Sequence, residues 1–278
     1  MFIDTHLHLI DRKHLRYPWL AGETVLNADF LYADYALQAR RVGIEATLHM
    51  EVDVAPSQME AESRMIQSLA GEPGSLIRGA IAACRPEDDS FPSYLERQEG
   101  NPFIKGFRRV LHVMPDALLD NQTVHSNMRR LNGSRLTFDL CVVPRQLEKA
   151  AKLVDLAPDT TFILDHCGVP AIASGEATVW RQQITEMATR PNVMAKISGI
   201  VAYADAASWD VETLRPYVEH VAQTFGFDRL VWGSDWPVCT LGGGLSTWVA
   251  ATHALFAGCS AQEREKVYSA NARRIWGL

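Results

Sequence analysis

Eight short apolar segments recur along the chain, and between them apolar residues repeat with helical spacing. The eight segments lie at residues 2–8, 44–50, 76–83, 103–110, 136–143, 161–166, 192–198 and 229–234. Strands that alternate with helices pair in parallel, because a helix is long enough to return the chain to the same edge of the sheet. With 278 residues and no linker or low-complexity stretch, the pattern predicts one domain, a single (β/α)8 barrel over residues 1–278. A doubly wound open sheet is the alternative.

Two histidines stand at the end of the first predicted strand, in the segment FIDTHLH at residues 2–8. Side chains alternate between the two faces of a strand, so His6 and His8 project from the same face. Neutral imidazole binds zinc, and histidine also transfers protons near neutral pH or donates a hydrogen bond to an oxyanion. The pair therefore predicts a hydrolytic site, with or without a metal. The alternative is two histidines at the surface.

His166 and Asp235 follow the sixth and the eighth predicted strand. In a closed barrel the eighth strand lies beside the first, so Asp235 should approach His6 and His8. Aromatic neighbours in the segment WGSDWP (232–237) would partly desolvate this carboxyl group, which raises its pKa and improves it as a general base. The alternatives are an Asp235 that caps a turn and a His166 that is structural. Because barrel enzymes place their chemistry at the carboxyl ends of strands, these positions favour the barrel over the open sheet.

Composition excludes several classes of function. A formal net charge of −6 and a pI near 5.8 argue against nucleic-acid binding, which normally needs a basic patch. No uninterrupted apolar run is long enough to cross a bilayer and no leader precedes the first strand, so we expect a cytoplasmic protein without a membrane partner. The five cysteines are widely spaced and form no CxxC motif, which indicates neither a disulfide framework nor a structural zinc site. The sequence is compatible with a homo-oligomer.

The chain resembles the amidohydrolase superfamily over nearly its whole length, in particular the amidohydrolase-2 branch of 2-pyrone-4,6-dicarboxylate lactonase, L-fuconolactonase and L-rhamnonolactonase. The motifs that carry the resemblance are IDTHLH (3–8), YPWL (17–20), GFRR (106–109), DL (139–140) ahead of Pro144, LDHCG (164–168), KISG (196–199), GSDWPV (233–238) and NA (271–272). The resemblance implies a (β/α)8 fold and hydrolysis of a lactone. It also implies the histidines of the site and the general base, namely His6, His8, His166 and Asp235.

The resemblance does not establish whether a metal is bound or how many metals there are. Many members of the superfamily bridge two metals through a lysine or another ligand on a middle strand. Here the fifth strand offers Asp139, and the only lysine in a comparable position is Lys196 on the seventh. We therefore expect no binuclear centre and no obligatory cofactor. If a single divalent cation such as zinc is bound, its ligands would come from His6, His8, His166 and Asp235.

Without a metal, the histidines would bind the lactone oxygens while a cationic side chain stabilises the oxyanion. By similarity to the branch that cation is Arg108, which points into the barrel, whereas its neighbour Arg109 faces the helices. The fork of an arginine suits a carboxylate or a lactone carbonyl, because it donates two hydrogen bonds. Three further residues are expected to contact the substrate: Lys196, Glu51 and Trp236.

These observations predict a hydrolase that opens a small lactone, of the sugar-acid or pyrone-dicarboxylate type, by water that Asp235 activates. A sugar-acid lactone would place the enzyme in carbohydrate catabolism. The alternative is a metal-dependent, non-oxidative decarboxylase of the same branch, in which the same histidines and aspartate hold zinc. A ligand-binding barrel without turnover is a third alternative, which the complete set of histidines and aspartate disfavours.

Overall fold

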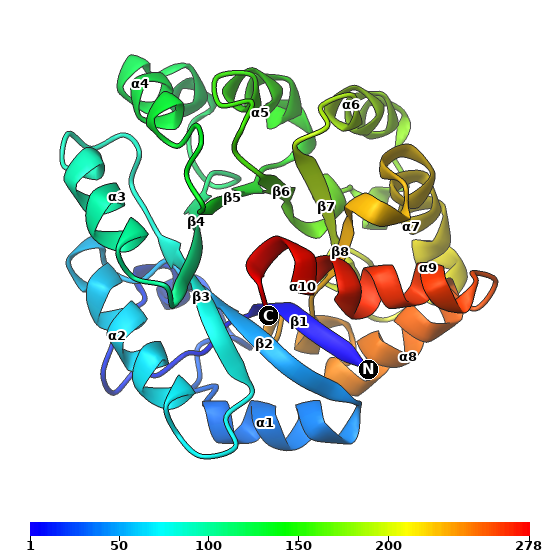
Figure 1. Ribbon diagram of the computed structural model, residues 1–278. Coiled ribbons are helices and arrows are strands. Elements are labelled where there is room, and N and C mark those ends of the chain that lie inside the picture. The colour runs from blue at the N-terminus through cyan, green and yellow to red at the C-terminus, as the bar shows by residue number, and fades with distance from the viewer.

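The computed structural model describes residues 1–278 and contains one parallel sheet of eight strands in sequence order. The strands are β1 (Phe2–Leu7), β2 (Ile44–Met50), β3 (Ile77–Ala83), β4 (Ile104–Val110), β5 (Thr137–Cys141), β6 (Phe162–Leu164), β7 (Val193–Ile197) and β8 (Leu230–Trp232). The sheet curls into a barrel, which Figure 1 shows end on. The predicted (β/α)8 architecture is confirmed.

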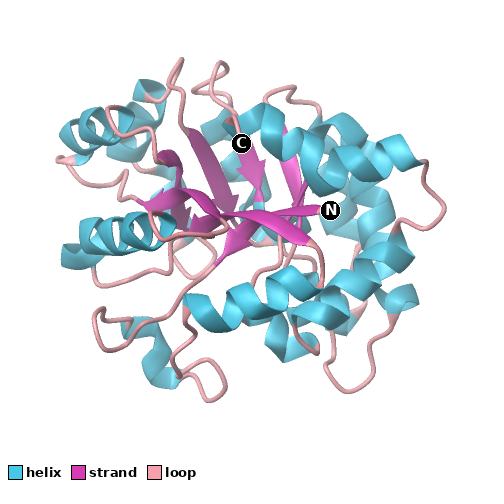
Figure 2. Ribbon diagram, turned by 60° about the horizontal axis from the view of Figure 1, so that its bottom comes forward, coloured by secondary structure: helices cyan, strands magenta, loops and turns pink.

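Helices surround the strands on the outside, as Figures 1 and 2 show. They are α1 (Tyr32–Arg41), α2 (Met59–Ala70), α3 (Phe91–Glu99), α4 (Gln122–Arg130), α5 (Leu147–Val154), α6 (Thr178–Ala188), α7 (Val211–Phe225), α8 (Leu245–Leu255) and α9 (Ala261–Glu265), and a further helix, α10 (Asn271–Trp276), covers one end of the barrel. A π-helical turn, Lys266–Ala270, joins the last two. None of these helices combines the length and the apolar character that a membrane span requires.

The barrel closes along a seam between β1 and the chain at and beyond β8, residues 230–236. The backbone N–H of Asp235 donates to the carbonyl of His6 at 2.9 Å, and that of His8 donates to the carbonyl of Trp236 at 2.7 Å. The buried carboxylate of Asp4 accepts a hydrogen bond from the backbone N–H of Ser234 at 2.7 Å. The first and last strands are therefore neighbours, which excludes the open sheet and brings Asp235 next to the histidines of β1.

The amino end of the barrel is filled and covered. Apolar side chains of the strands fill the interior, among them Ile3, Leu48, Ile81, Ile163 and Val231, and Ala272 and Trp276 of α10 belong to the same cluster. The indole N–H of Trp276 donates to Thr137 Oγ1, at the start of β5, at 3.2 Å. In Figure 1, α10 lies over the middle of the ring of strands. A ligand can therefore reach the interior only from the carboxyl end.

Strands β6 and β8 are shorter than predicted because the chain turns sharply where each ends. After β6, residues Asp165–Gly168 form a tight turn in which His166 and Cys167 have φ values of 52° and 56°. After β8, Asp235 has a φ of 56°. Left-handed backbone is uncommon for residues other than glycine and tends to be found at functional sites. Both turns lie at the open end of the barrel.

Candidate active site

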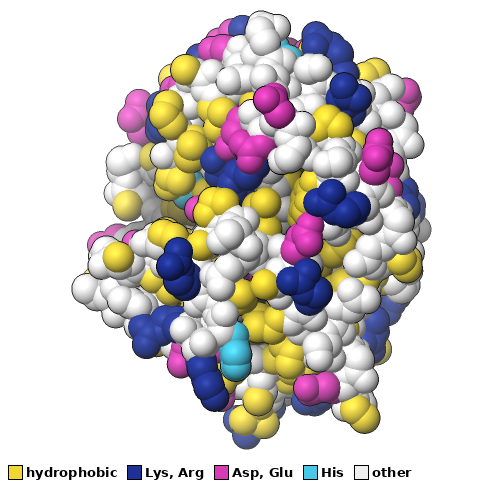
Figure 3. Space-filling model, turned by 90° about the vertical axis from the view of Figure 1, so that its left-hand side faces the viewer, with side chains coloured by type: hydrophobic (Ala, Val, Ile, Leu, Met, Phe, Trp, Pro, Cys, Tyr) yellow, Lys and Arg dark blue, Asp and Glu magenta, His cyan; other side chains and the backbone are white.

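A cavity of about 450 Å³ opens at the carboxyl end of the barrel. In Figure 3 the molecule is hollowed at the left edge of the view, and a histidine side chain is visible inside. The lining includes His8, Arg108, His166 and Asp235, and most of the remaining wall is apolar. Ligand sites are commonly of this size and combine apolar walls with a few polar groups. The cavity therefore brings four of the predicted site residues together.

The imidazoles of β1 and the carboxylate of Asp235 meet at one point. His6 Nε2 lies 3.1 Å from His8 Nε2, and Asp235 Oδ1 lies 3.6 Å from the first and 3.4 Å from the second of these atoms. His8 Nδ1 lies 3.0 Å from the carbonyl oxygen of Met50, which can only accept a hydrogen bond. The proton of neutral His8 is therefore on Nδ1, and its Nε2 keeps a lone pair toward the cavity.

His166 faces Asp235 from the other side. Its Nδ1 lies 3.0 Å from Ser198 Oγ and 3.9 Å from Asp235 Oδ2. Gly199, at φ +65°, makes this approach possible, because a Cβ atom there would lie 2.4 Å from His166 Nδ1 and 2.6 Å from Asp235 Oδ2. A side chain at residue 199 would thus push the imidazole and the carboxylate apart.

Burial sets the protonation states of this group. It raises the pKa of Asp235 to about 6, although His166 and Arg108 act in the opposite direction. It lowers the pKa of His8 to about 3, with a further contribution from Arg108. Burial also lowers the pKa values of His6 and His166. At neutral pH, Asp235 is therefore a carboxylate surrounded by neutral imidazoles, and it is a stronger base than an exposed aspartate.

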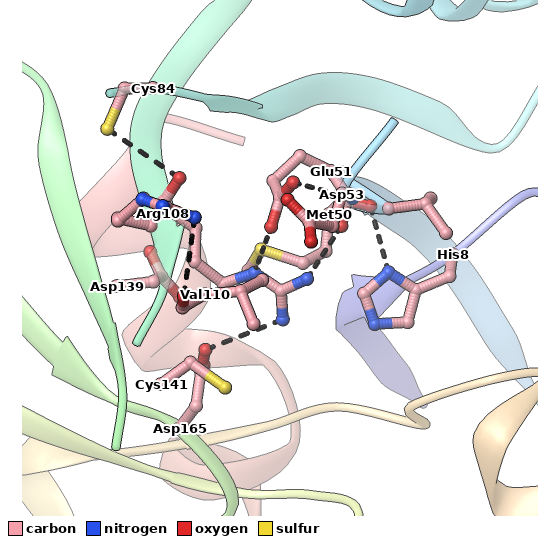
Figure 4. Close-up of polar contacts among 12 residues, drawn as sticks. His8, Met50, Glu51, Asp53, Cys84, Arg108, Val110, Asp139, Cys141 and Asp165 are labelled. Atoms are coloured by element: carbon pink, nitrogen blue, oxygen red, sulfur yellow. Dashed lines mark hydrogen bonds and ion pairs between the residues drawn. The ribbon is translucent and has the colours of Figure 1, made fainter. Parts of the chain in front are cut away.

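Arg108 and Arg109 point to opposite sides of β4. Arg108 donates from Nε to Glu51 Oε1 at 2.6 Å and from Nη2 to the carbonyl of Glu51 at 2.7 Å, and its Nη1 lies 3.3 Å from His6 Nε2. Figure 4 shows the guanidinium between Glu51 and Asp165. Arg109 pairs instead with Glu87, at 2.7 Å, and does not line the cavity. Only Arg108 can contact a ligand in the cavity.

Lys196 lies behind His6 and not in the cavity, which corrects the prediction that it contacts substrate. Its Nζ lies 2.5 Å from Asp139 Oδ1, 3.0 Å from Asp165 Oδ1 and 3.2 Å from His6 Nδ1. The ammonium group is fully buried, and these contacts surround it. The pKa of Asp165 is held well below its ordinary value by Lys196 and His6, against the effect of burial. Lys196 can therefore orient His6, and it does not line the cavity.

Glu51 and Trp236 also lie outside the cavity wall, contrary to their predicted contact with substrate. Glu51 is 1% exposed, and its two carboxylate oxygens accept hydrogen bonds from Arg108 and from the backbone N–H of Asp53. Trp236 packs against Phe30 and Tyr35, with ring centroids 5.6 and 5.5 Å apart. The left-handed backbone of Asp235, at φ 56°, turns the chain between the two residues, so that Asp235 lines the cavity and Trp236 does not.

Several polar residues of this region were not predicted as site residues, among them Asp165, His112 and Asp53. Asp165 Oδ1 lies 3.4 Å from His6 Nδ1, and its position directly before His166 was a signal that could have been read. His112 lines the cavity with Cys141, and its Nδ1 lies 3.0 Å from the thiol. Asp53 lines the cavity where the chain leaves β2. His112 and Asp53 lie in loops, where no periodic pattern indicates the direction of a side chain.

Two groups of side chains have the spacing of metal ligands: His6, His8 and Asp235, and His6, Asp165 and His166. Zinc bound tetrahedrally at 2.0–2.2 Å places its ligand atoms about 3.4 Å apart. The separations of 3.1, 3.4 and 3.6 Å in the first group fit this value. In the second group the ammonium of Lys196 already neutralises Asp165. The first group therefore fits one divalent cation, and the predicted ligand His166 is not part of it.

Comparison with known proteins agrees with the fold. The chain matches the amidohydrolase family over residues 3–278. It is 28% identical over 300 residues to an L-fucono-1,5-lactonase of Burkholderia multivorans, covering 99% of this chain and 96% of that protein. It is 28% identical over 221 residues to the L-fucono-1,5-lactonase of Burkholderia ambifaria, covering 77% and 74%.

Among solved structures, an amidohydrolase from Burkholderia multivorans with bound zinc has 25% sequence identity and a TM-score of 0.89. The similarity covers 100% of this chain and 99% of that one. Both chains thus share the barrel and its connections from end to end. The chain therefore belongs to the amidohydrolase family and is an enzyme of the hydrolase class.

Proposed function

We propose that this protein hydrolyses a small lactone. The observation that carries the proposal is the convergence of the buried carboxylate of Asp235, neutral imidazoles and the guanidinium of Arg108 in one cavity. Hydrolysis of an ester needs a general base for water and a positive group for the carbonyl oxygen, and both are present within one ligand site. The two relatives that are 28% identical are lactonases, which supports a cyclic ester as the substrate.

Asp235 acts as the general base in this proposal. With a pKa of about 6, it is ionised at neutral pH and takes a proton from a water molecule, while His8 Nε2 accepts the second hydrogen bond of that water. The oxygen of the water attacks the lactone carbonyl carbon, and the bond from this carbon to the ring oxygen then breaks. Protonated Asp235 returns its proton to the ring oxygen, which becomes the hydroxyl of the product. One carboxylate thus serves both halves of the reaction.

Arg108 stabilises the negative charge that develops on the carbonyl oxygen. Two hydrogen bonds to Glu51, of 2.6 and 2.7 Å, fix the guanidinium before substrate binds. A donor that is already in place needs no reorganisation during the reaction, which is why such groups lower the barrier strongly. Glu51 and Lys196 contribute indirectly, because they hold Arg108 and His6 in position.

A divalent cation held by His6, His8 and Asp235 would polarise the lactone carbonyl as a Lewis acid. We propose that this cation is not obligatory, because Arg108 already places a positive charge 3.3 Å from His6 Nε2. The same charge raises the electrostatic cost of a cation at that position.

A panel of aldonolactones and pyrone carboxylates, assayed with a pH indicator with and without chelator, tests the proposal. Ring opening releases a proton near neutral pH, so we expect turnover of at least one lactone that persists when the metal content is negligible. Activity that disappears with the metal and returns with zinc would establish an obligatory cation. Release of CO2 from a carboxylated substrate by a stoichiometric metal enzyme would establish the decarboxylase instead.

A further inference from the structure

Asp53 is held in a fixed position on the cavity wall, just beyond the end of β2. Its Oδ1 accepts a hydrogen bond from Arg85 Nη2 at 2.8 Å, and its backbone N–H donates to Glu51 Oε2 at 2.8 Å. Its φ of 46° is in the left-handed region, which aspartate and asparagine tolerate better than most residues. The side chain is 28% exposed, and its Oδ2 accepts no hydrogen bond from the protein. Asp53, which lines the cavity, thus holds one carboxylate oxygen without a partner in the protein.

Asp53 is also connected to the catalytic groups. Glu51, which accepts from the backbone of Asp53 through Oε2, accepts from Arg108 through Oε1. Figure 4 shows Asp53 and Glu51 side by side next to the guanidinium of Arg108. Two hydrogen bonds through Glu51 therefore set the position of Asp53 relative to Arg108, the oxyanion donor. A substrate that binds Asp53 is thereby also positioned relative to Arg108.

The charges that line the cavity disfavour an anionic substrate. Three carboxylates line it, those of Glu23, Asp53 and Asp235, and the only lysine or arginine among the lining residues is Arg108. Arg108 is paired with Glu51 and is needed for the carbonyl oxygen. A lactone with carboxylate substituents would find no unpaired cation, whereas the hydroxyl groups of an uncharged lactone can donate to a carboxylate. The product of ring opening is itself a carboxylate, so the same charges favour its release.

We infer that Asp53 is a specificity-determining residue. Its Oδ2 accepts a hydrogen bond from a hydroxyl group of an uncharged, hydroxylated lactone, and its charge excludes lactones that carry a carboxylate at that place. The inference rests on the proposed lactone hydrolysis. A site built to bind a hydroxyl group disfavours analogues without it, because the acceptor loses that hydrogen bond when such an analogue binds.

The test compares an aldono-1,5-lactone with 2-pyrone-4,6-dicarboxylate as substrates of the wild type and of Asp53→Asn. Asparagine keeps the shape and tolerates the backbone, but Arg85 holds its amide oxygen, so the NH2 group faces the substrate. We expect kcat/KM for the aldonolactone to fall about 20-fold, mainly through KM. We expect kcat/KM for the dicarboxylate to rise several-fold from a low value. An equal change for both substrates would mean that Asp53 only supports the loop, and would overturn the inference.

Two further variants keep the inference open to refutation. Asp89→Asn removes an exposed carboxylate outside the cavity and should leave the ratio of the two kcat/KM values unchanged. Arg85→Gln leaves the charge of Asp53 without its partner, so turnover of the dicarboxylate should fall further while that of the aldonolactone stays within threefold. A shift of the ratio by Asp89→Asn, or a wild type that prefers the dicarboxylate, would overturn the inference alone. A wild type that opens neither lactone nor any other on the panel would overturn the proposed function as well.

Discussion

The two ends of the barrel are built from the same eight strands but use opposite kinds of residue. At the amino end, Ile3 and its neighbours pack against Trp276 of α10 in an apolar cluster. At the carboxyl end, His6 of the same strand lies among buried charges, with Asp165 and Lys196 behind it. The amino end is packed with apolar side chains. At the carboxyl end polar groups are buried, which is unfavourable, and their mutual contacts hold them in fixed positions. Three residues along β1, from Ile3 to His6, thus separate the apolar interior of the barrel from the reactive end.

The largest effect should come from the carboxyl end. Asp235→Asn keeps the shape of the side chain but removes the base, so kcat should fall about 500-fold, or roughly 3.7 kcal/mol of transition-state stabilisation. Steady-state rates on the best lactone of the panel measure this, with a thermal melt to show that the variant is folded. A variant that keeps more than a tenth of the wild-type rate would exclude Asp235 as the base.

A change at the amino end should show the opposite signature. Trp276→Ala removes a large side chain that is 5% exposed from the interior cluster. The free energy of unfolding should fall by about 3 kcal/mol, while kcat/KM of the folded variant stays within a few-fold of wild type. Urea denaturation and steady-state kinetics at low temperature measure the two quantities. Loss of catalysis in a fully folded Trp276→Ala protein would show that the two ends are coupled.

Arg108 and Arg109 allow the two faces of one strand, β4, to be compared directly, because both arginines are buried and both pair with a glutamate. Replacing either with methionine breaks a buried ion pair, so both variants should lose stability. Only Arg108→Met should lose catalysis, by about 100-fold in kcat/KM, or ~2.7 kcal/mol. Parallel measurements of melting temperature and kcat/KM separate the two effects. Equal catalytic losses would contradict the assignment of faces.

The smallest effect is a shift of the pH profile. A general base works only when it is deprotonated, so kcat/KM should be full above the pKa of Asp235, about 6, and should fall tenfold per pH unit below it. Arg108 lowers this pKa, so the break in Arg108→Met should move to higher pH. Trp276→Ala should leave the break in place. A wild-type break near 4, the ordinary value of an aspartate, would show that burial does not act on this carboxylate.

The sequence was sufficient to predict the elements and their order, because strand and helix periodicities alternate clearly. It also predicted that Asp235 approaches His6, since closure of a barrel makes β1 and β8 neighbours. It could not predict the depth of a side chain along a strand. Lys196 has the sequence context of a ligand contact, yet two carboxylates from other strands, Asp139 and Asp165, hold it below the cavity. Such compensation depends on residues far apart in sequence and is visible only in three dimensions.

Turn geometry limited the prediction in a different way. His166 and Asp235 have left-handed backbone, and although both residue types adopt it more often than most, their presence in a sequence does not predict it. The turn at Asp235 directs Trp236 away from the cavity, and β8 ends earlier than its apolar run suggests. Asp53 adopts the same kind of backbone and was missed for the same reason. The backbone preferences of the residue types were therefore least informative at the positions with unusual backbone conformations. These positions carry residues of the candidate site.

The seam between β1 and β8 has a consequence for how the enzyme is assembled. It joins groups that are far apart in the chain, such as Asp4 and Ser234, which are 230 residues apart. Contacts of such long separation form late, because a large loop must close before they stabilise anything. His6 and His8 are synthesised long before Asp235, their proposed general base. After dilution from denaturant, catalytic activity should therefore recover later than the helical circular dichroism signal. The delay between the two signals measures the time that closure of the barrel takes.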